Sequence, residues 1–132
     1  MIVVESSAIV AIVRHQSEAE KFAQVLDGES EAIMSAVSLL ETNMVVAGRR
    51  ADADPRQVAL LLASLGIAIA DVDNDQSARA VDAFFRFGKG RHPARLNLAD
   101  CFAYALAKSR DVPLLFKGDD FARTDVVPAW RP

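Results

Sequence analysis

The chain has 132 residues, of which 52% are hydrophobic and 25% charged, and its formal net charge is −3. These values predict one globular domain, residues 1–132, and argue against a generally basic nucleic-acid binder while allowing a local basic patch. The single cysteine, Cys101, excludes an intrachain disulfide and a cysteine-rich zinc site. No apolar run approaches the ~20 residues of a membrane span and no targeting segment is recognisable, so we expect a soluble, cytoplasmic protein without membrane contact.

The first predicted element is a short buried strand at residues 2–4, formed by three β-branched residues. Glu5 and two serines follow it, and apolar residues then recur at helical spacing, which predicts a turn and a helix with Ser6 or Ser7 as N-cap. In open parallel sheets the site lies at the carboxyl ends of the strands. Glu5 is therefore placed where a functional carboxylate is expected, although an acid that caps the helix explains the same position equally well.

Helices and strands alternate along the rest of the chain. Apolar spacing and capping residues predict helices over residues 17–26, 37–47, 52–65, 75–87 and 97–108, and strands over 31–35, 67–70 and 113–116, with 126–127 as an optional edge strand. The expected N-caps are Ser17, Asp54 and Asn97. Such alternation implies a parallel sheet covered on both faces, so the predicted fold class is α/β with four to five strands. The stripe of helix 37–47 expected to face the core consists of Val37, Leu40, Met44 and Ala47.

Acidic residues occupy four unusual places. Glu5 follows the first strand, and Glu41 lies on a helix with largely apolar neighbours. Asp100 lies in the first turn of helix 97–108, and Asp119, with Asp120 beside it, follows the strand 113–116. Each also has a plain structural explanation: the helix dipole for Asp100, exposure to solvent for Glu41, and a turn for the pair at 119–120.

If these acids converge, their mutual repulsion requires a divalent cation. Burying a carboxylate costs free energy unless a cation or a hydrogen-bond donor compensates its charge. Carboxylate oxygens suit Mg²⁺ or Mn²⁺, and no set of Cys and His residues points to zinc. A carboxylate-held metal commonly acts on phosphodiesters, which it clamps while it activates a water. The sequence thus predicts a metal site of this kind.

Four blocks of the sequence together resemble a PIN domain: Met1–Ile12, Ser35–Glu41, Leu96–Ala107 and Leu114–Phe121. They occur in the right order and spacing and span nearly the whole chain. The closest likeness is to the VapC toxins of bacterial toxin–antitoxin pairs. The resemblance implies a three-layer α/β/α sandwich around a short parallel sheet, and a Mg²⁺- or Mn²⁺-dependent endoribonuclease that hydrolyses RNA phosphodiesters.

The resemblance also implies site residues and partners. Ser6 matches the family's small hydroxyl residue beside the first acid and is expected to orient a ligand or water. Such proteins typically form homodimers and are held inactive by a cognate antitoxin, so an antitoxin, an RNA substrate and a second copy are the expected partners. The implied catalytic acids are Glu5, Glu41, Asp100 and Asp119, with Glu5, Asp100, Asp119 and Asp120 as metal ligands.

One position departs from the family pattern, because the family's first acid is an aspartate and this chain has Glu5. The extra methylene moves the carboxylate by about one bond length, and metal chemistry responds to displacements of ~1 Å. The alternative function is therefore a catalytically impaired PIN domain that retains antitoxin and RNA binding.

A basic stretch leads into the Asp100 helix. It contains Lys89, Arg91 and Arg95, with no acidic residue between positions 83 and 99. We expect these three residues to hold an RNA backbone near the metal.

Aromatic and apolar residues complete the expectations. Phe84, Phe85 and Phe87 are expected in the core, and Trp130 is expected to anchor the tail by packing on the domain or a partner. The apolar residues of the first two helices exceed the needs of one core face, so a dimer or antitoxin contact is expected there.

Overall fold

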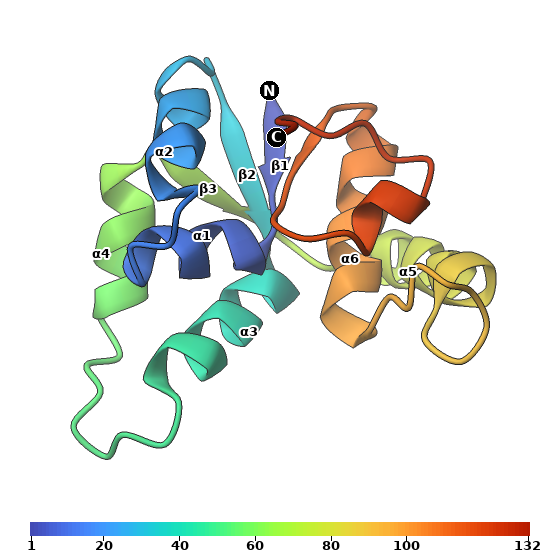
Figure 1. Ribbon diagram of the computed structural model, residues 1–132. Coiled ribbons are helices and arrows are strands. Elements are labelled where there is room, and N and C mark those ends of the chain that lie inside the picture. Colours follow the sequence, from blue (N-terminus) through green and yellow to red (C-terminus); the bar gives the residue numbers. More distant parts are fainter.

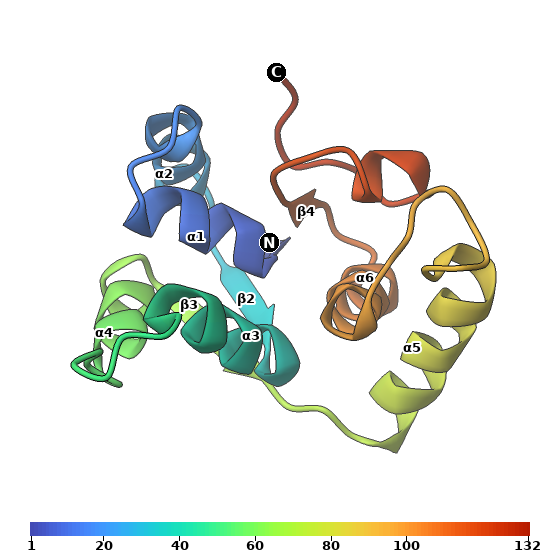
Figure 2. The same cartoon turned by 60° about the horizontal axis from the view of Figure 1, so that its bottom comes forward.

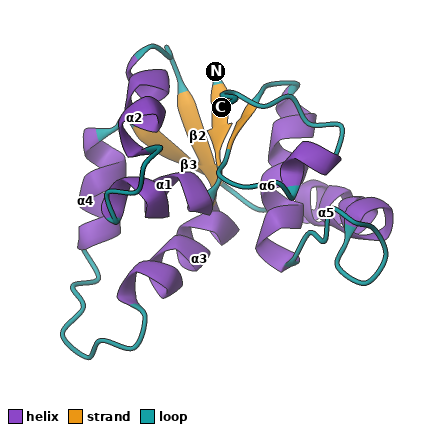
Figure 3. Cartoon of the chain, in the orientation of Figure 1, coloured by secondary structure: helices purple, strands orange, loops and turns teal.

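The computed structural model describes residues 1–132 and places a four-stranded parallel sheet at the centre of the molecule (Figures 1 and 3). The strands are β1 (Ile2–Val4), β2 (Ala32–Ser35), β3 (Ile67–Ala70) and β4 (Leu114–Leu115), in the order β3-β2-β1-β4. Val3 of β1 is paired with Ile33 on one side and Leu114 on the other. The first strand therefore lies inside the sheet, with its carboxyl end between two neighbours.

Six helices surround the sheet: α1 (Ser6–Val13), α2 (Ala19–Asp27), α3 (Ala36–Ala47), α4 (Gln57–Ser64), α5 (Asn74–Phe87) and α6 (Leu98–Arg110), followed by a 3₁₀ turn, η1 (Phe121–Arg123). Helices α1, α2 and α4 lie on one side of the sheet and α5 and α6 on the other (Figure 1). The expected α/β/α sandwich is confirmed. No helix is both long and apolar enough to cross a membrane.

Alternation along the strands divides the core into two clusters. Val3 and Ile33 pack with residues of α5 and α6, whereas Ile2, Val4 and Met34 pack with residues of α1, α2 and α4. Because successive side chains of a strand point to opposite faces, a run of three apolar β-branched residues serves both layers. Ile2, Val3 and Val4 are all at most 1% exposed.

The carboxyl ends of β1 and β2 run directly into helices. Glu5 joins β1 to α1, and Ser35, the last residue of β2, is the N-cap of α3 and accepts a hydrogen bond from the Val37 amide at 3.2 Å. Figure 2 brings this end of the sheet forward and shows α1 and α3 leaving it beside α6. Three helices are thus close to one edge of the sheet.

Two predicted helix starts and the optional strand are wrong. Ser17 does not cap α2, because its hydroxyl donates to the Glu18 carboxylate, and Asp54 caps a turn at the Arg56 amide while α4 begins only at Gln57. Residues 126–127 form no strand. Leu114 instead makes a single bridge to Pro128, which lacks the N–H that a longer ladder needs.

The predicted apolar stripe of α3 is also wrong. Leu40 and Met44 are 62% and 65% exposed, whereas Ser38 and Thr42 are buried. Helix α3 packs against α1 and α6, and the Thr42 hydroxyl donates to the Ser38 carbonyl at 2.7 Å. The buried Thr42 hydroxyl is thus satisfied within its own helix, whereas the buried Ser38 hydroxyl has no hydrogen-bond partner.

The expected places of other apolar residues are partly corrected. Phe87 is buried, but Phe84 and Phe85 are exposed, because their side of α5 faces away from the sheet. On the first two helices Val10, Ile12, Val13 and Val25 are partly exposed, and the dimer or antitoxin contact expected there stays a prediction. Trp130 packs its ring edge-on against Phe22, with 5.4 Å between ring centroids, which confirms the anchoring of the tail.

Candidate active site

Glu5 comes to the site from the end of β1 and is 3% exposed. It is itself the N-cap of α1, in place of the expected serines, and its Oε2 accepts from the Ser7 amide at 2.9 Å and from the Ser7 hydroxyl. Its Oε1 accepts from the Ser6 hydroxyl at 2.7 Å. Both explanations of this residue therefore hold at once, since the acid caps a helix and lies in the candidate site.

Glu41 reaches the same point from the middle of α3. The Ser6 hydroxyl also contacts Glu41 Oε1, so this serine bridges two carboxylates. A hydroxyl has one hydrogen and can donate to only one of them at a time. Two acids thus compete for a single neutral donor.

Asp100 arrives from the first turn of α6 and is 8% exposed. Its Oδ2 accepts from the Asn97 amide at 3.0 Å, while the Asn97 side chain accepts from the Asp100 amide at 2.9 Å. This capping box fixes the carboxyl group and leaves Oδ1 without a hydrogen bond. Asn97 is the N-cap that the sequence predicts.

Carboxylate oxygens of Glu5, Glu41 and Asp100 lie within 4.8 Å of one another. No ion pair in the molecule involves any of the three. Burial raises the pKa of Asp100 to about 7, and the nearby charges of Glu5 and Glu41 add to the rise. Burial likewise raises the pKa of Glu5.

Such a donor set fits a divalent cation. Three oxygen-bearing side chains from three different elements converge, no basic side chain neutralises them, and hydrogen bonds hold two of them in place. Hard oxygen ligands of this kind favour Mg²⁺-like ions over zinc. The cluster could hold a metal ion.

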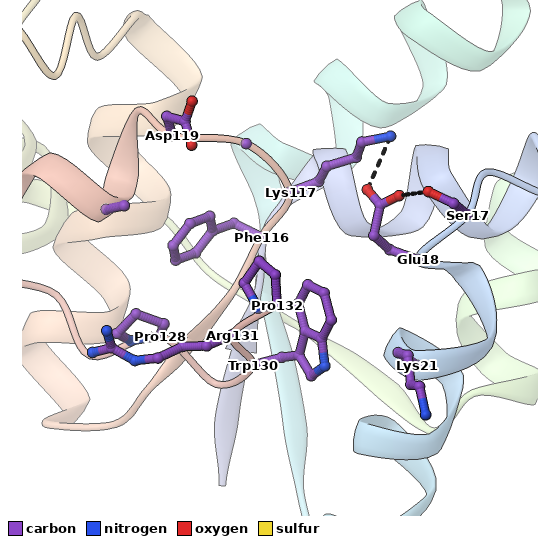
Figure 4. Close-up of a pocket in the computed structure, with 12 residues that line it drawn as sticks. Ser17, Glu18, Lys21, Phe116, Lys117, Asp119, Pro128, Trp130, Arg131 and Pro132 are labelled. Atoms are coloured by element: carbon purple, nitrogen blue, oxygen red, sulfur yellow. Dashed lines mark hydrogen bonds and ion pairs between the residues drawn. The ribbon is translucent and has the colours of Figure 1, made fainter.

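Asp119 and Asp120 lie outside this cluster, and both are exposed. Asp120 is close enough for its charge to raise the pKa of Asp100, whereas Asp119 lines a separate hollow beside the C-terminal tail (Figure 4). The chain turns between β4 and these residues at Gly118, whose φ of 100° is readily adopted only by glycine. Which of two adjacent acids faces the site depends on this turn.

The three predicted basic residues, Lys89, Arg91 and Arg95, are exposed in the segment between α5 and α6. The Arg91 guanidinium lies 4.6 Å from the centroid of the Phe85 ring, so its planar group covers an exposed aromatic. Sequence reasoning gave Ser7 no site role, although its hydroxyl joins Glu5 to the Lys117 amide. The sequence signal for this role is the position of Ser7, two residues after Glu5.

Comparison with known proteins identifies the family. The PIN domain model matches residues 2–127. The chain is 38% identical to VapC ribonuclease Mb0640 of Mycobacterium bovis over 130 residues, which covers 98% of this chain and 99% of that protein. It is 43% identical to a ribonuclease VapC of Mycolicibacterium smegmatis over 124 residues, 94% of this chain and 96% of the other. The chain belongs to the PIN-domain VapC family of ribonucleases.

Solved structures agree with this VapC assignment at the level of the fold. VapC20 of Mycobacterium tuberculosis, described as a toxin that cleaves the sarcin-ricin loop, superposes with a TM-score of 0.78 at 18% identity over the whole of both chains. A toxin–antitoxin complex from Klebsiella pneumoniae gives a TM-score of 0.71, also at 18% identity over the whole of both chains. These likenesses confirm the fold that the resemblance of the four sequence blocks implies.

Proposed function

We propose that the protein hydrolyses RNA phosphodiester bonds with a Mg²⁺ or Mn²⁺ ion held by Glu5, Glu41 and Asp100. The observation that carries the proposal is the convergence of these three carboxylates within 4.8 Å, without a basic side chain among them. When bound, the ion supplies charge stabilisation at the phosphate and lowers the pKa of water.

The chain's own residues preorganise this site. Ser6 and Ser7 fix the Glu5 carboxylate, and the Asn97 amide fixes that of Asp100. Such supporting hydrogen bonds set the direction of a ligand before the metal arrives. Because the folded protein holds the Asp100 proton up to about pH 7, metal binding releases a proton at acidic pH and tightens as the pH rises.

The fourth acid comes from the loop after β4. Asp119 and Asp120 are both predicted ligands, and the influence of Asp120 on the Asp100 pKa favours Asp120 as the residue that faces the ion. Asp119 borders the neighbouring hollow instead. Comparing Asp119→Asn with Asp120→Asn for Mn²⁺ affinity distinguishes the two residues.

Lys89, Arg91 and Arg95 are proposed to hold the RNA backbone. They are exposed, they precede the first turn of α6, and none of them forms an ion pair. Lysine and arginine contacts to phosphates strengthen binding without reading sequence. Ser6, which lies between Glu5 and Glu41, is proposed to orient a ligand or water at the cleaved bond.

The test is cleavage of total RNA with Mn²⁺ by the protein and by Asp100→Asn. We expect cleavage by the parent and by the control variant Asp111→Asn, but not by Asp100→Asn. Asp111→Asn is the matched control, because Asp111 follows the other end of α6 in a left-handed conformation that asparagine adopts readily. Cleavage by Asp100→Asn at the parental rate contradicts the proposed site.

A catalytically impaired PIN domain is the second candidate, and one observation favours it. Both carboxylate oxygens of Glu5 already accept hydrogen bonds from Ser6 and Ser7. Glu5→Asp shortens the side chain and distinguishes the two functions: if only this variant cleaves RNA, the parent is an impaired nuclease that retains binding. If both cleave and Glu5→Asp is faster, Glu5 is a tolerated ligand.

An antitoxin and a second copy of the chain are the proposed protein partners. Exposed apolar residues occur on the helices beside the acids, and contiguous exposed apolar surface marks interaction sites. They are Leu40 and Met44 of α3, Val81, Phe84 and Phe85 of α5, and Leu98 of α6. Light scattering of the parent and of Phe85→Lys tests self-association, with a lower mass expected for the variant.

A further inference from the structure

A hollow of about 850 Å³ opens beside the C-terminal tail, outside the three-carboxylate cluster. Its walls come from segments far apart in sequence: the start of α2, the loop after β4 and residues 128–132 (Figure 4). Small-molecule sites typically enclose roughly 300–1,000 Å³, so a nucleotide-sized group fits this space.

Two aromatic residues border the hollow. Phe116 is buried, and Trp130 is half-buried and held edge-on against Phe22 in the core. Figure 4 shows the rings of Phe116 and Trp130 on either side of Pro132. The indole is thus fixed by packing while it still lines an open space, and a fixed aromatic surface is what an unpaired base stacks on.

Charged residues of both signs also line the hollow: the basic residues Lys21, Lys117 and Arg131, and the acids Glu18 and Asp119. Lys117 pairs with Glu18 at 3.0 Å, but Lys21 and Arg131 form no ion pair. These two therefore remain available to phosphate groups. Aromatic rings combined with unpaired basic side chains are typical of sites for single-stranded nucleic acid.

The hollow is linked to the candidate active site by two hydrogen bonds. The Lys117 amide donates to the Ser7 hydroxyl at 2.8 Å, and the Ser7 hydroxyl donates to the Glu5 carboxylate. The same loop thus forms a wall of the hollow and supports a residue of the site. The loop after β4 therefore connects the lining of the hollow with the Glu5 carboxylate.

We propose that this hollow binds an unpaired nucleotide of the RNA, next to the bond that is cleaved, with its base against Trp130 and its phosphates at Lys21 and Arg131. The proposal rests on the ribonuclease function proposed above. A base that is paired in a duplex is not free to enter the hollow.

Trp130 is the only tryptophan of the chain, so a change in tryptophan emission reports that the hollow beside it is occupied. The Asp100→Asn variant is titrated with a short fluorescein-labelled oligouridylate, and with its duplex with oligoadenylate, in the presence of Mn²⁺. Anisotropy of the label measures the complex, and tryptophan emission measures the hollow. We expect the single strand to bind and to quench Trp130 with the same midpoint, and the duplex to bind more weakly without quenching.

Substitutions then separate stacking from packing. Base stacking on an aromatic is worth roughly 1–3 kcal/mol, so Trp130→Leu, which keeps apolar packing, should weaken single-strand binding by about fivefold to a hundredfold. Trp130→Phe should recover most of this loss. Thermal unfolding checks that the tail remains folded in both variants.

The phosphate contacts are tested through salt. Lys21→Ala combined with Arg131→Ala should reduce the slope of log affinity against log salt concentration by about 1.4, because each contact to a single strand contributes ~0.7. Arg110→Ala, at the far end of α6, removes one positive charge outside the hollow and should leave the slope unchanged.

Several outcomes overturn the proposal. They are a complex seen by anisotropy without any change in Trp130 emission, equal affinity of Trp130→Leu and Trp130→Phe, or no complex with the single strand. If Trp130→Leu binds RNA normally but no longer copurifies with the antitoxin, the hollow serves a protein partner and the proposal is also wrong. Cleavage of total RNA by the parent is measured separately. If the parent cleaves RNA but Trp130 emission does not change on RNA binding, the nucleotide site in the hollow is rejected and the proposed ribonuclease function is not.

Discussion

The starts of α1 and α6 bring two buried carboxylates to the same place in different ways. At α6 two residues share the capping, because the Asn97 side chain accepts from the Asp100 amide and one oxygen of Asp100 accepts from the Asn97 amide. At α1, Glu5 serves alone as the cap, and both of its oxygens accept hydrogen bonds. The α6 arrangement leaves the Oδ1 of Asp100 without a hydrogen bond, whereas the α1 arrangement leaves no such oxygen on Glu5.

This difference indicates that Asp100 offers the more accessible ligand atom and that Glu5 depends on its serines. Helix starts are suited to hold a carboxylate because their first amides lack partners within the helix. A residue that both caps a helix and binds an ion divides its oxygens between the two tasks. The following predictions test this contrast, beginning with the largest expected effect.

Asp100→Asn should lower Mn²⁺ affinity by more than about a hundredfold, because even the loss of an outer partner of a metal ligand costs roughly 10- to 100-fold. The helix should remain capped, since the asparagine oxygen can still accept from the Asn97 amide. Calorimetric titration with Mn²⁺ measures the effect, with Asp111→Asn as control. Parental Mn²⁺ affinity in Asp100→Asn would remove Asp100 from the ligand set.

The metal-free protein should become less stable as the pH rises from about 4 to about 7. The folded state holds the Asp100 proton up to about pH 7, whereas the ordinary pKa of this group is 3.8, so losing the proton in this range favours unfolding. At ~1.4 kcal/mol for each pKa unit, the expected fall in unfolding free energy is about 1–4 kcal/mol.

Urea unfolding in EDTA at several pH values measures this fall. Asp100→Asn should flatten the pH dependence, and saturating Mn²⁺ should reverse it, because the ion requires the deprotonated carboxylate. A metal-free protein whose unfolding free energy rises over the same range would contradict the raised pKa of Asp100.

Ser7→Ala should weaken Mn²⁺ binding by about tenfold, the lower end of the effect of an outer partner. The substitution removes the Ser7 hydroxyl from Glu5 Oε2 but keeps the amide that caps the helix. Since this hydroxyl lowers the pKa of Glu5, its loss should also favour the protonated acid. Calorimetry at neutral pH measures the affinity, and an unchanged value would mean that the capping amide alone orients Glu5.

Asn97→Ala should have the smallest effect on the site. It removes the side-chain cap of α6 and should lower the unfolding free energy by ~1 kcal/mol. The Asn97 amide still donates to Asp100, so we expect RNA cleavage to stay within about twofold of the parent. Urea unfolding and a cleavage assay are measured on the same preparation. A large loss of cleavage with little loss of stability would mean that the two helix starts do not differ.

Most of the fold could be predicted from the sequence, because its signals are local. The β-branched run before Glu5, the apolar stretches of β2 to β4 and the cap at Asn97 each define an element on their own. The exposed face of α3 could not be predicted, because its buried side is chosen by the close approach of α1 and α6, which depends on small residues such as Ser38.

The candidate site shows the same limit. Glu5, Glu41 and Asp100 could be singled out because each lies among apolar residues or at a strand end, and the structure brings all three together. The orientation of Asp119 and Asp120 could not be predicted, because it follows from the backbone turn at Gly118. The hollow beside the tail could not be predicted from the sequence either. Its walls come from segments far apart in the chain, namely residues 128–132, the loop after β4 and the start of α2.

The single bridge between Leu114 and the tail has a consequence for association through the sheet. The Leu114 amide donates to the Val127 carbonyl and the Ala129 amide donates to the Leu114 carbonyl, both at 2.8 Å, so the outer hydrogen-bonding groups of this two-residue strand are already used. A further strand therefore has no free N–H or C=O group of Leu114 to pair with. The opposite edge differs, because β3 has four residues, a partner on one side only and an Ile69 that is 40% exposed. Strand addition, whether by a peptide or by aggregating chains, is therefore directed to β3, on the far side of the sheet from the tail.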